Sequence, residues 1–495
     1  MRSWRLMSTS FSPKIPIAIC LLLGMVLSET ENYDSEIAQP VPECLGNQVT
    51  DKEINEALLK GGQSATVLLC QGARLNLNNA IRFSAPNQSL YTVGRPLSTQ
   101  RAALVVMGKN MSTAIVGACK ACSGAHLGFV EIDGNRKNLG WIDPRRGGGA
   151  LLEFGGDARD QTIEFVRAYD PRSWSVLHAQ EGSKPNTAQS CNGMIIRNNQ
   201  IGPSGISPNF GVQSAGQPNS EGATKENSPI PKSNFQSKRH AEGIYPAGQW
   251  ADGISLACPN SYVYNNSVVD ATDGGIVIFG APGSQVRYNS IKVENRNMLG
   301  GINLVDFKPF NGNYKGVLVA DNLLITDGAM IKVGIAMGTM VWGSKNSTSY
   351  RNYGATVRNN VFTSSNGGYF GYGIALSGFN FTNVYSNTFL PSAKFDGRLT
   401  SSCIHTPSKL PTPRNLTYDV STTYNVKQQM TTTADTLVFL ICIAPLGARD
   451  SFDFFNSSNF EDPSTNSIDA QGMNEIVLPL NDWQYTPVKK ARRYL

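Results

Sequence analysis

The chain has 495 residues, of which 40% are apolar, so it can bury a sizeable core, and its 16% of charged residues lies below the ~25% usual in soluble domains. Its 48 glycines and 26 prolines are close to background, which excludes a collagen-like or a wholly disordered chain. The net charge of +6 arises mainly at the two ends of the chain, so the body offers no basic face and we expect no nucleic-acid partner.

The N-terminus has the pattern of a secretory signal peptide. Arg2, Arg5 and Lys14 precede an apolar run over residues 15–27, and polar residues follow from Ser28. At 1.5 Å per residue this run spans about 20 Å, less than the ~30 Å of a bilayer core. We therefore predict that residues 1–28 are a cleaved signal peptide, that the mature protein is secreted and extracellular, and that it has no transmembrane anchor.

The cysteines and glycosylation sequons agree with export. An even set of cysteines remains after the signal peptide and predicts up to four disulfides of undetermined pairing. Within it, Cys119 and Cys122 form C-x-x-C, and the absence of a second C-x-x-C favours a structural pair over a redox or zinc centre. The disulfide candidates are Cys44, Cys70, Cys119, Cys122, Cys191, Cys258, Cys403 and Cys442. The N-x-S/T sequons, which can carry glycan only where exposed, lie at Asn87, Asn110, Asn265, Asn346, Asn380, Asn415 and Asn456.

The first predicted elements after the signal peptide are a helix and a strand. Residues 51–60 are polar with apolar side chains on one helical face, and the strand Thr66–Leu69 follows. Helical periodicity is then absent from the middle of the chain.

Two short β-type patterns recur through the middle of the chain. In the first, an Asn lies between apolar residues; in the second, Gly-Ile begins an alternating segment. Most successive copies of each pattern lie 22 to 39 residues apart, a spacing typical of a solenoid. Asn tolerates the left-handed backbone of a tight corner, and stacked Asn side chains can hydrogen-bond along the stack. The Asn positions are Asn199, Asn266, Asn289, Asn322, Asn360 and Asn387, and the Gly-Ile isoleucines are Ile254, Ile276, Ile302, Ile335 and Ile374.

These repeats predict an all-β chain folded as a right-handed parallel β-helix. A β-sandwich would also have many short strands, but it would not repeat the same Asn and Gly-Ile positions once per period. We expect the solenoid over residues 29–402, with the helix over 51–60 as its N-terminal cap. Residues 203–240, rich in Ser, Pro, Asn and Gly, read as a long mobile loop. Residues 403–495 read as an irregular C-terminal cap and tail, with a strand over 436–443.

Several segments resemble the pectin-lyase-like superfamily, most closely a group of secreted fungal proteins within it. The resemblance spans roughly residues 44–390 and implies a right-handed parallel β-helix that acts on an acidic or neutral polysaccharide. It is specific for fold and weak for chemistry, because one fold hosts lyases, hydrolases, epimerases and non-enzymes. The segments are ATVLLCQGA (65–73), SAPNQ (84–88), EIDGNR (131–136), WADGIS (250–255) and DATDGGI (270–276).

A more distant similarity is to polygalacturonases, whose site uses Asn-Thr-Asp, a later Asp-Asp pair, Gly-His-Gly and Arg-Ile-Lys. Asp252 stands where the first aspartate would be, and Asp273 or Asp270 where the pair would be. Gly-Ala-Pro-Gly over 280–283 replaces Gly-His-Gly, and no Arg-Ile-Lys follows. Pectate lyases instead need a Ca²⁺ cluster of carboxylates, and no such cluster is evident. Neither mechanism is transferred; we expect no cofactor, or Ca²⁺ if the protein is a lyase.

The Gly-Ile positions serve as a ruler for candidate catalytic residues. Asp252 lies two residues before Ile254, and Asp273 and Lys332 each lie three before their isoleucines. With adjacent strands about 4.8 Å apart, Asp252 and Asp273 would be neighbours on successive coils, compatible with the carboxylate pair of a glycosidase. Asp before Gly is equally a turn residue, so a merely structural role stays open.

Four further residues could join this pair. Asp270 could raise the pKa of its neighbour, and Asp306 follows its isoleucine by four residues. Lys332 lies among apolar residues and would need an acidic partner or solvent. His178, close to Trp174 and Glu181, is the best-placed general base among four histidines, although a structural role is the alternative. Rings that could stack on sugars or pack in the core belong to Trp250, Trp342 and Tyr372.

Together these features predict a secreted, monomeric protein that acts on a polysaccharide or cell-wall glycan. The leading hypothesis is a glycoside hydrolase that uses Asp252 and Asp273 as acid and base, and a polysaccharide lyase or epimerase is the nearest enzyme alternative. A non-catalytic wall-binding or host-interaction protein on the same scaffold is the alternative from a different class, favoured by the missing polygalacturonase elements.

Overall fold

The computed structural model describes residues 43–144, 147–185, 187, 190–206, 250–341, 350–399, 412–428 and 443–446. Several expectations lie outside these residues and stay predictions: the signal peptide over 1–28, most of the loop over 203–240, and most of the tail over 403–495. Individual residues outside them are Trp342, Asn346, Cys403, Cys442 and Asn456. All described residues belong to one compact unit.

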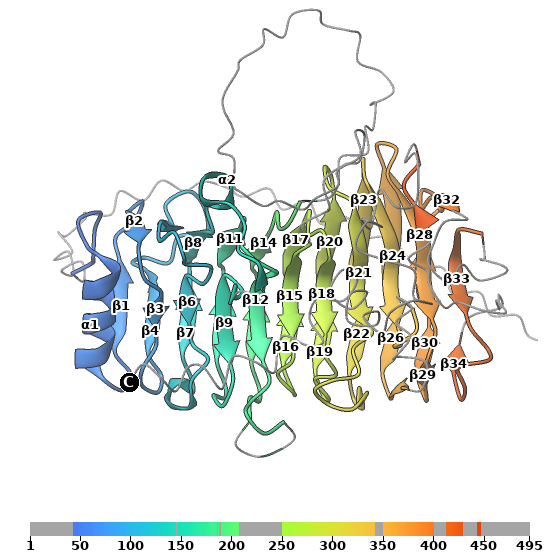
Figure 1. Ribbon diagram of the computed structural model, residues 1–495, viewed down its shortest axis with the longest axis horizontal. Coiled ribbons are helices and arrows are strands. Elements are labelled where there is room, and N and C mark those ends of the chain that lie inside the picture. The colour runs from blue at the N-terminus through green and yellow to red at the C-terminus, as the bar shows by residue number, and fades with distance from the viewer. Residues whose placement is uncertain are drawn as a thin grey trace, which may run out of the picture. The chain divides into compact units, whose positions relative to one another are not determined.

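Three long sheets wind around a common core, and each takes every third strand of the chain in turn (Figure 1). The first sheet contains β1 (Thr66–Leu69), β4 (Ser89–Thr92), β7 (His126–Gly128), β10 (Thr162–Glu164), β13 (Ile195–Arg197), β16 (Tyr262–Tyr264), β19 (Gln285–Arg287), β22 (Leu318–Ala320), β26 (Thr356–Arg358), β30 (Asn383–Tyr385) and β34 (Lys427–Gln428). The second contains β2 (Arg74–Leu77), β5 (Ala102–Val106), β8 (Val130–Asp133), β11 (Arg167–Tyr169), β14 (Gln200–Ile201), β17 (Ser267–Val269), β20 (Ser290–Val293), β23 (Leu323–Asp327), β27 (Val361–Ser365) and β31 (Thr388–Phe389).

The third sheet contains β3 (Ile81–Arg82), β6 (Ile115–Val116), β9 (Leu152–Gly155), β12 (Ser175–Gln180), β15 (Asp252–Leu256), β18 (Gly274–Ile278), β21 (Met298–Leu304), β24 (Met330–Met337), β28 (Tyr369–Leu376) and β33 (Arg414–Tyr418). Neighbouring strands in the three sheets pair in parallel, as between β15 and β18 or β19 and β22. One coil therefore contributes one strand to each sheet, which confirms the predicted parallel β-helix. β33 and β34 extend the third and first sheets, so the coils continue beyond residue 402.

A few elements lie outside the three sheets. They are the helices α1 (Asp51–Gly61) and α2 (Arg136–Leu139), a 3-10 turn over Lys120–Cys122, the parallel pair β25 (Asn352–Tyr353) and β29 (Phe379–Asn380), and the antiparallel pair β32 (Arg398–Leu399) and β35 (Ile443–Ala444). No helix in the described ranges is long and apolar enough to cross a membrane.

The N-terminal helix α1 covers the end of the solenoid beside β1, as predicted (Figure 1). Thr50 caps it, because its hydroxyl accepts a hydrogen bond from the Glu53 backbone while the Glu53 carboxylate accepts one from the Thr50 backbone. Ile54 and Leu58 are wholly buried in the core that the first coil would otherwise expose.

The recurring Gly-Ile pair is explained by close packing in the third sheet. Ile254, Ile276 and Ile302 lie in register and are wholly buried. The glycine before each also lies against the core: a Cβ on Gly275 would come within 2.7 Å of Ile291 Cγ2 and 2.6 Å of the Gly301 carbonyl oxygen. Two successive residues thus face the core, and only glycine leaves room for the apolar side chains of the second sheet, which are Val268, Ile291, Leu324, Phe362 and Phe389 along the row.

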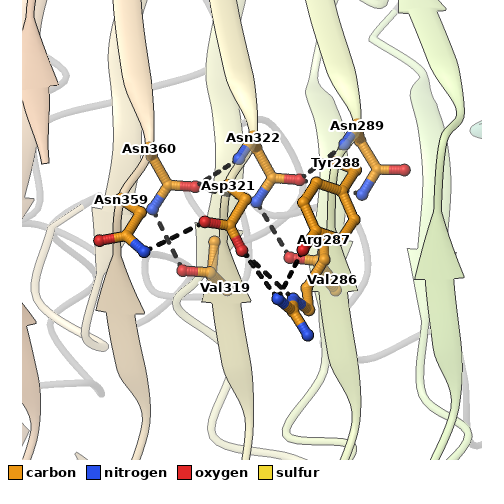
Figure 2. A network of polar contacts seen from close by, with 9 residues as sticks. All are labelled: Val286, Arg287, Tyr288, Asn289, Val319, Asp321, Asn322, Asn359 and Asn360. Carbon is orange, nitrogen blue, oxygen red and sulfur yellow. Dashed lines mark hydrogen bonds and ion pairs between the residues drawn. The ribbon is translucent and has the colours of Figure 1, made fainter. Parts of the chain in front are cut away.

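The Asn ladder runs along the corner between the first and second sheets (Figure 2). The Asn322 side-chain oxygen accepts hydrogen bonds from the backbone and side-chain nitrogens of Asn289, both at 3.0 Å. Its amide nitrogen donates to the Val286 carbonyl and to Asn360, each at 2.9 Å. The same contacts link all six predicted positions, from Asn199 to Asn387, so the ladder is confirmed.

The left-handed backbone at this corner belongs to the residue before each ladder Asn. Tyr288, Asp321 and Asn359 have φ of 56°, 58° and 55°. Contrary to expectation, the ladder Asn itself does not adopt this conformation; it supplies the buried hydrogen bonds. This division explains why the residue before it varies among Asn, Asp, Ser and Tyr.

Three disulfides join the described cysteines: Cys44–Cys70, Cys119–Cys122 and Cys191–Cys258. The C-x-x-C pair is therefore closed on itself, as the structural interpretation requires. No group of three or more His, Cys, Asp or Glu in the described ranges is arranged to hold a metal ion.

Candidate functional site

The third sheet carries the ionisable residues that were predicted from their spacing to the Gly-Ile isoleucines. Asp252 begins β15, Asp273 immediately precedes β18, and Asp306 lies two residues after β21, so successive coils supply one carboxylate each. All three are buried, with exposed fractions of 0%, 7% and 2%. We call Asp252, Asp273 and Asp306 the carboxylate cluster.

Asp252 is held by groups that favour its charged form. One carboxylate oxygen accepts a 2.7 Å hydrogen bond from the Ser255 hydroxyl, and the other accepts a 2.9 Å bond from the Gly274 backbone. Burial raises the pKa of Asp252 to about 7, although these two bonds and His178 act in the opposite direction. Near neutral pH this carboxylate is therefore poised between its two protonation states.

Asp273 has a different environment. Its carboxylate accepts no hydrogen bond from the described residues, and its backbone bonds to Ala251 and Gly300 fix the chain. Burial, and then the carboxylates of Asp252 and Asp306, raise the pKa of Asp273 well above its usual range. Of the pair, Asp273 is therefore the group whose surroundings do more to favour the protonated form.

Two glycines leave space for Asn303 beside this pair. A Cβ on Gly300 would meet the Asn303 side-chain oxygen at 1.9 Å. A Cβ on Gly274 would lie 3.1 Å from the Asn303 amide nitrogen and 3.2 Å from an Asp252 carboxylate oxygen. The Asn303 amide and the Asp252 carboxylate therefore lie against the same stretch of backbone. The Asn303 oxygen is buried and has no hydrogen-bond partner among the described residues.

His178 lies one coil before Asp252 and pairs with a glutamate. Its Nδ1 is 2.9 Å from Glu153 Oε2, and Gln180 donates to the same oxygen at 2.5 Å. Burial lowers the pKa of His178, but Glu153, Glu181 and Asp252 outweigh it and the net direction is upward. Burial raises the pKa of Glu181.

The second ring nitrogen of His178 points away from this pair. Its Nε2 is buried without a hydrogen-bond partner in the described part of the chain. The Trp174 ring packs edge-on against the imidazole, with the two ring centroids 4.8 Å apart. In the sheet, His178 lies in register with Ser255, whose hydroxyl bonds Asp252. The His178–Glu153 pair therefore lies beside the carboxylate cluster, because the strand that carries His178 pairs with the strand that carries Asp252.

Lys332 lies in the same register position as Asp273, two coils further on. Gly274 aligns with Gly300, and Gly300 with Val333, so the residues before them share one row. Lys332 is wholly buried, and burial lowers its pKa well below the usual range. The solvated lysine that the sequence allowed is not what the structure shows.

The remaining candidates lie elsewhere or pack internally. Asp270 has a left-handed backbone and its carboxylate accepts hydrogen bonds from the backbones of Glu294 and Asn295, so it holds the loop after β20. Tyr372 is wholly buried and Trp250 is 9% exposed, which leaves neither ring open for stacking on a sugar.

The sequons differ in accessibility. Asn380 is 3% exposed and its side-chain oxygen accepts a hydrogen bond from the Tyr424 backbone, so the folded chain has no room for a glycan there. The exposed sequons are Asn87, Asn110, Asn265 and Asn415.

Three polar residues of the site were missed by sequence reasoning: Glu153, Ser255 and Asn303. For two of them the sequence held a signal, because Ser255 and Asn303 each follow an isoleucine of the Gly-Ile pattern by one residue. Glu153 carried no such signal, because its coil has Leu151-Leu152 in place of Gly-Ile.

No protein-family model and no curated protein matches the chain. Similar solved structures include the A-module of a mannuronan C-5 epimerase from Azotobacter vinelandii, 14% identical, with a TM-score of 0.39 over 79% of this chain and 98% of that chain. A surface protein and adhesin of Streptococcus pneumoniae is 12% identical, with a TM-score of 0.41 over 79% and 94%. An endo-xylogalacturonan hydrolase from Aspergillus tubingensis is 12% identical, with a TM-score of 0.34 over 74% and 96%. Values this low carry no argument about activity, and the fold rests on the sheets themselves.

Proposed function

We propose that this protein is a secreted glycoside hydrolase acting on a polysaccharide, with Asp273 as the general acid and Asp252 as the partner carboxylate. One observation carries the proposal: two buried carboxylates on adjacent coils have environments that separate their protonation states. Glycoside hydrolysis needs such a pair, one carboxyl protonated to release the leaving group and one ionised.

The roles follow from the hydrogen bonds. Ser255 and Gly274 donate to Asp252 and stabilise its negative charge, so this group is the base or nucleophile. Asp273 receives no such help from the described residues and faces two like charges, so it retains the proton to donate. Asn303 and His178 flank the pair and would orient the substrate or the attacking water.

The test is a pair of isosteric variants, Asp252→Asn and Asp273→Asn, assayed on a panel of polysaccharides. Each should lose at least about 10²-fold in rate, the lower range for general acid–base catalysis, because an amide cannot transfer the proton. Reducing ends should appear without unsaturated uronate absorbance, which distinguishes hydrolysis from a lyase reaction. Asp270→Asn is the matched control, because that carboxylate only anchors a loop; its melting temperature should fall while turnover persists.

A secreted, extracellular location belongs to the same proposal. The N-terminal pattern over residues 1–28 and the three disulfides support it, since disulfides persist in oxidising compartments.

A non-catalytic glycan-binding protein is the second candidate, and one observation favours it. Asp252 is wholly buried, and both of its oxygens accept internal hydrogen bonds, as in a structural corner. On this alternative Asp252→Asn lowers the melting temperature, and no polysaccharide in the panel is cleaved.

A further inference from the structure

The outer face of the first sheet carries a row of tyrosines and arginines, away from the carboxylate cluster on the third sheet. Arg197, Tyr264 and Arg287 occupy one register position on successive coils, and Arg358 and Tyr385 continue it after Ala320. Tyr262 lies two residues before Tyr264 on the same face of β16. We call these six side chains, Arg197, Tyr262, Tyr264, Arg287, Arg358 and Tyr385, the tyrosine–arginine strip.

Two tyrosines of this strip are exposed, and its other four members are partly exposed. Tyr262 is 48% exposed and Tyr385 is 41% exposed, high values for aromatic side chains on a regular sheet. Tyr288, at the corner beside Arg287, is 54% exposed and has the Arg287 guanidinium over its ring at 4.8 Å (Figure 2). Buried packing therefore does not account for these tyrosines.

Internal contacts fix the orientation of three of the six side chains, Arg197, Tyr264 and Arg287. Arg197 pairs with Glu164 at 2.6 Å and donates to the Tyr264 hydroxyl at 3.0 Å. Arg287 pairs with Asp321 at 2.9 Å, which in turn accepts from Asn359 at 3.1 Å (Figure 2). Because these side chains are already ordered, a ligand would pay little conformational entropy to bind them.

The pattern of the strip matches a linear polymer. Its members recur once per coil, and neighbouring strands lie about 4.8 Å apart, so the row from Arg197 to Tyr385 spans roughly 24 Å. Flat tyrosine rings accept the C–H faces of sugars, and guanidinium groups bind carboxylates through paired hydrogen bonds.

The charge of the strip selects among polymers. Its three arginines outnumber the acids Glu164 and Asp321, and Arg358 has no ion-pair partner among the described residues. This modest positive excess suits carboxylates spaced along a glycan. A phosphate backbone calls for a more strongly basic face. We propose that the tyrosine–arginine strip is a non-catalytic binding surface for an acidic polysaccharide built from uronate units.

The test measures binding of polygalacturonate and alginate by titration calorimetry, with dextran as the neutral comparison. The protein carries Asp273→Asn so that the polymer stays intact. Adding Tyr262→Ala, Arg358→Ala and Tyr385→Ala should raise the Kd for the acidic polymer at least about tenfold, the loss of one or two charge-assisted or stacking contacts. For the protein with an unchanged strip, raising the salt concentration from 50 to 500 mM should weaken binding of the acidic polymer, since exposed charges are screened.

The matched control is Tyr353→Ala, an aromatic residue with 38% exposure on β25, outside the three sheets. It should leave the Kd unchanged. An unchanged Kd in the triple variant, an equal loss in the control, or equal binding of dextran would overturn the proposal. Tighter binding of a single-stranded oligonucleotide would overturn it in favour of a nucleic acid, and self-association abolished by the triple variant in favour of a second copy of the chain.

The outcome is separable from the catalytic proposal. With Asp273 intact, the triple variant should still cleave short oligosaccharides that are too small to reach the strip. Loss of binding in the triple variant tests the strip alone, and loss of turnover in Asp273→Asn tests the carboxylate cluster alone.

Discussion

At the scale of single residues, the carboxylates of Asp252 and Asp273 differ in the hydrogen bonds and charges around them. Asp252 accepts bonds from Ser255 and Gly274, whereas Asp273 faces the charges of Asp252 and Asp306. Both are buried as far as the described residues show, so each carboxyl is more easily held neutral than in water. Stability should therefore depend on pH at these positions.

We predict that Asp252→Asn flattens the pH dependence of folding. The folded-state pKa of Asp252 is raised to about 7, so its contribution to stability is complete below the ordinary carboxyl pKa and is lost as pH rises through 7. Relative to the variant, the wild-type free energy of unfolding should fall between about pH 4 and pH 8, by up to ~4 kcal/mol at ~1.4 kcal/mol per pKa unit. Denaturant titrations at five pH values measure it.

The control for this experiment is Asn383→Ala, which removes no ionisable group. Its curve should stay parallel to that of the wild type. Parallel curves for Asp252→Asn as well would show that Asp252 is not held neutral by burial, and would contradict the raised pKa of this carboxyl.

The residue scale also shows what the sequence could and could not predict about the site. The spacing from the Gly-Ile isoleucines placed Asp252 and Asp273 on successive coils, because an in-register parallel sheet converts similar offsets, here two and three residues, into neighbouring positions. It gave no information about burial, because the ruler describes one sheet and burial depends on everything packed over it. Lys332 shows this limit, since the ruler located its row but left a solvated side chain open.

At the scale of elements, the Asn ladder illustrates a repeat whose hydrogen bonds all lie in the core. Each ladder Asn is at most 3% exposed and serves neighbours on both sides. The pattern was predictable because every coil needs the same buried donor and acceptor at one corner. The coils before Asn199 were harder to predict from the sequence, because their strands β9 and β12 carry Leu152 and Leu177 without a preceding glycine and so lack the Gly-Ile pattern.

We predict that Asn322→Ala destabilises the fold by on the order of 3 kcal/mol. The change removes the acceptor for the backbone nitrogen of Asn289 and leaves it buried without a partner, at about 1–3 kcal/mol. It also removes one of the two acceptors of the Asn289 side-chain nitrogen, which keeps its bond to the Val263 carbonyl. Equilibrium unfolding in denaturant measures the loss. Asn383→Ala is the control, since that amide makes one long bond of 3.4 Å to Thr356, and it should change stability by less than ~1 kcal/mol. Equal effects of the two variants would mean that the ladder has no special energetic role.

At the scale of the whole molecule, the described coils carry a buried carboxylate cluster and a separate, partly exposed strip on one scaffold. The carboxylate cluster lies on the third sheet and the tyrosine–arginine strip on the first. A stack of coils in which each contacts mainly its neighbours keeps such surfaces in fixed register over many strands. The stability of the stack then depends on links between coils that are distant in sequence, and Cys44–Cys70 and Cys191–Cys258 are covalent examples.

We predict that the disulfides contribute unequally to stability. Cys191–Cys258 closes a segment with a sequence separation of 67 residues, whereas Cys119–Cys122 closes one of 3. If a disulfide stabilises mainly by restricting the unfolded chain, the long closure is worth about 4 kcal/mol and the short one less than about 2. Paired Cys→Ser variants of each bridge, unfolded in denaturant without reductant, measure the difference. A larger loss for the C-x-x-C variant would contradict this entropic account and indicate that the 3-10 turn over Lys120–Cys122 depends on its bridge for native packing. Thiol titration of the denatured, unreduced wild-type protein should find close to no free thiol, and one free thiol per missing partner in single Cys→Ser variants.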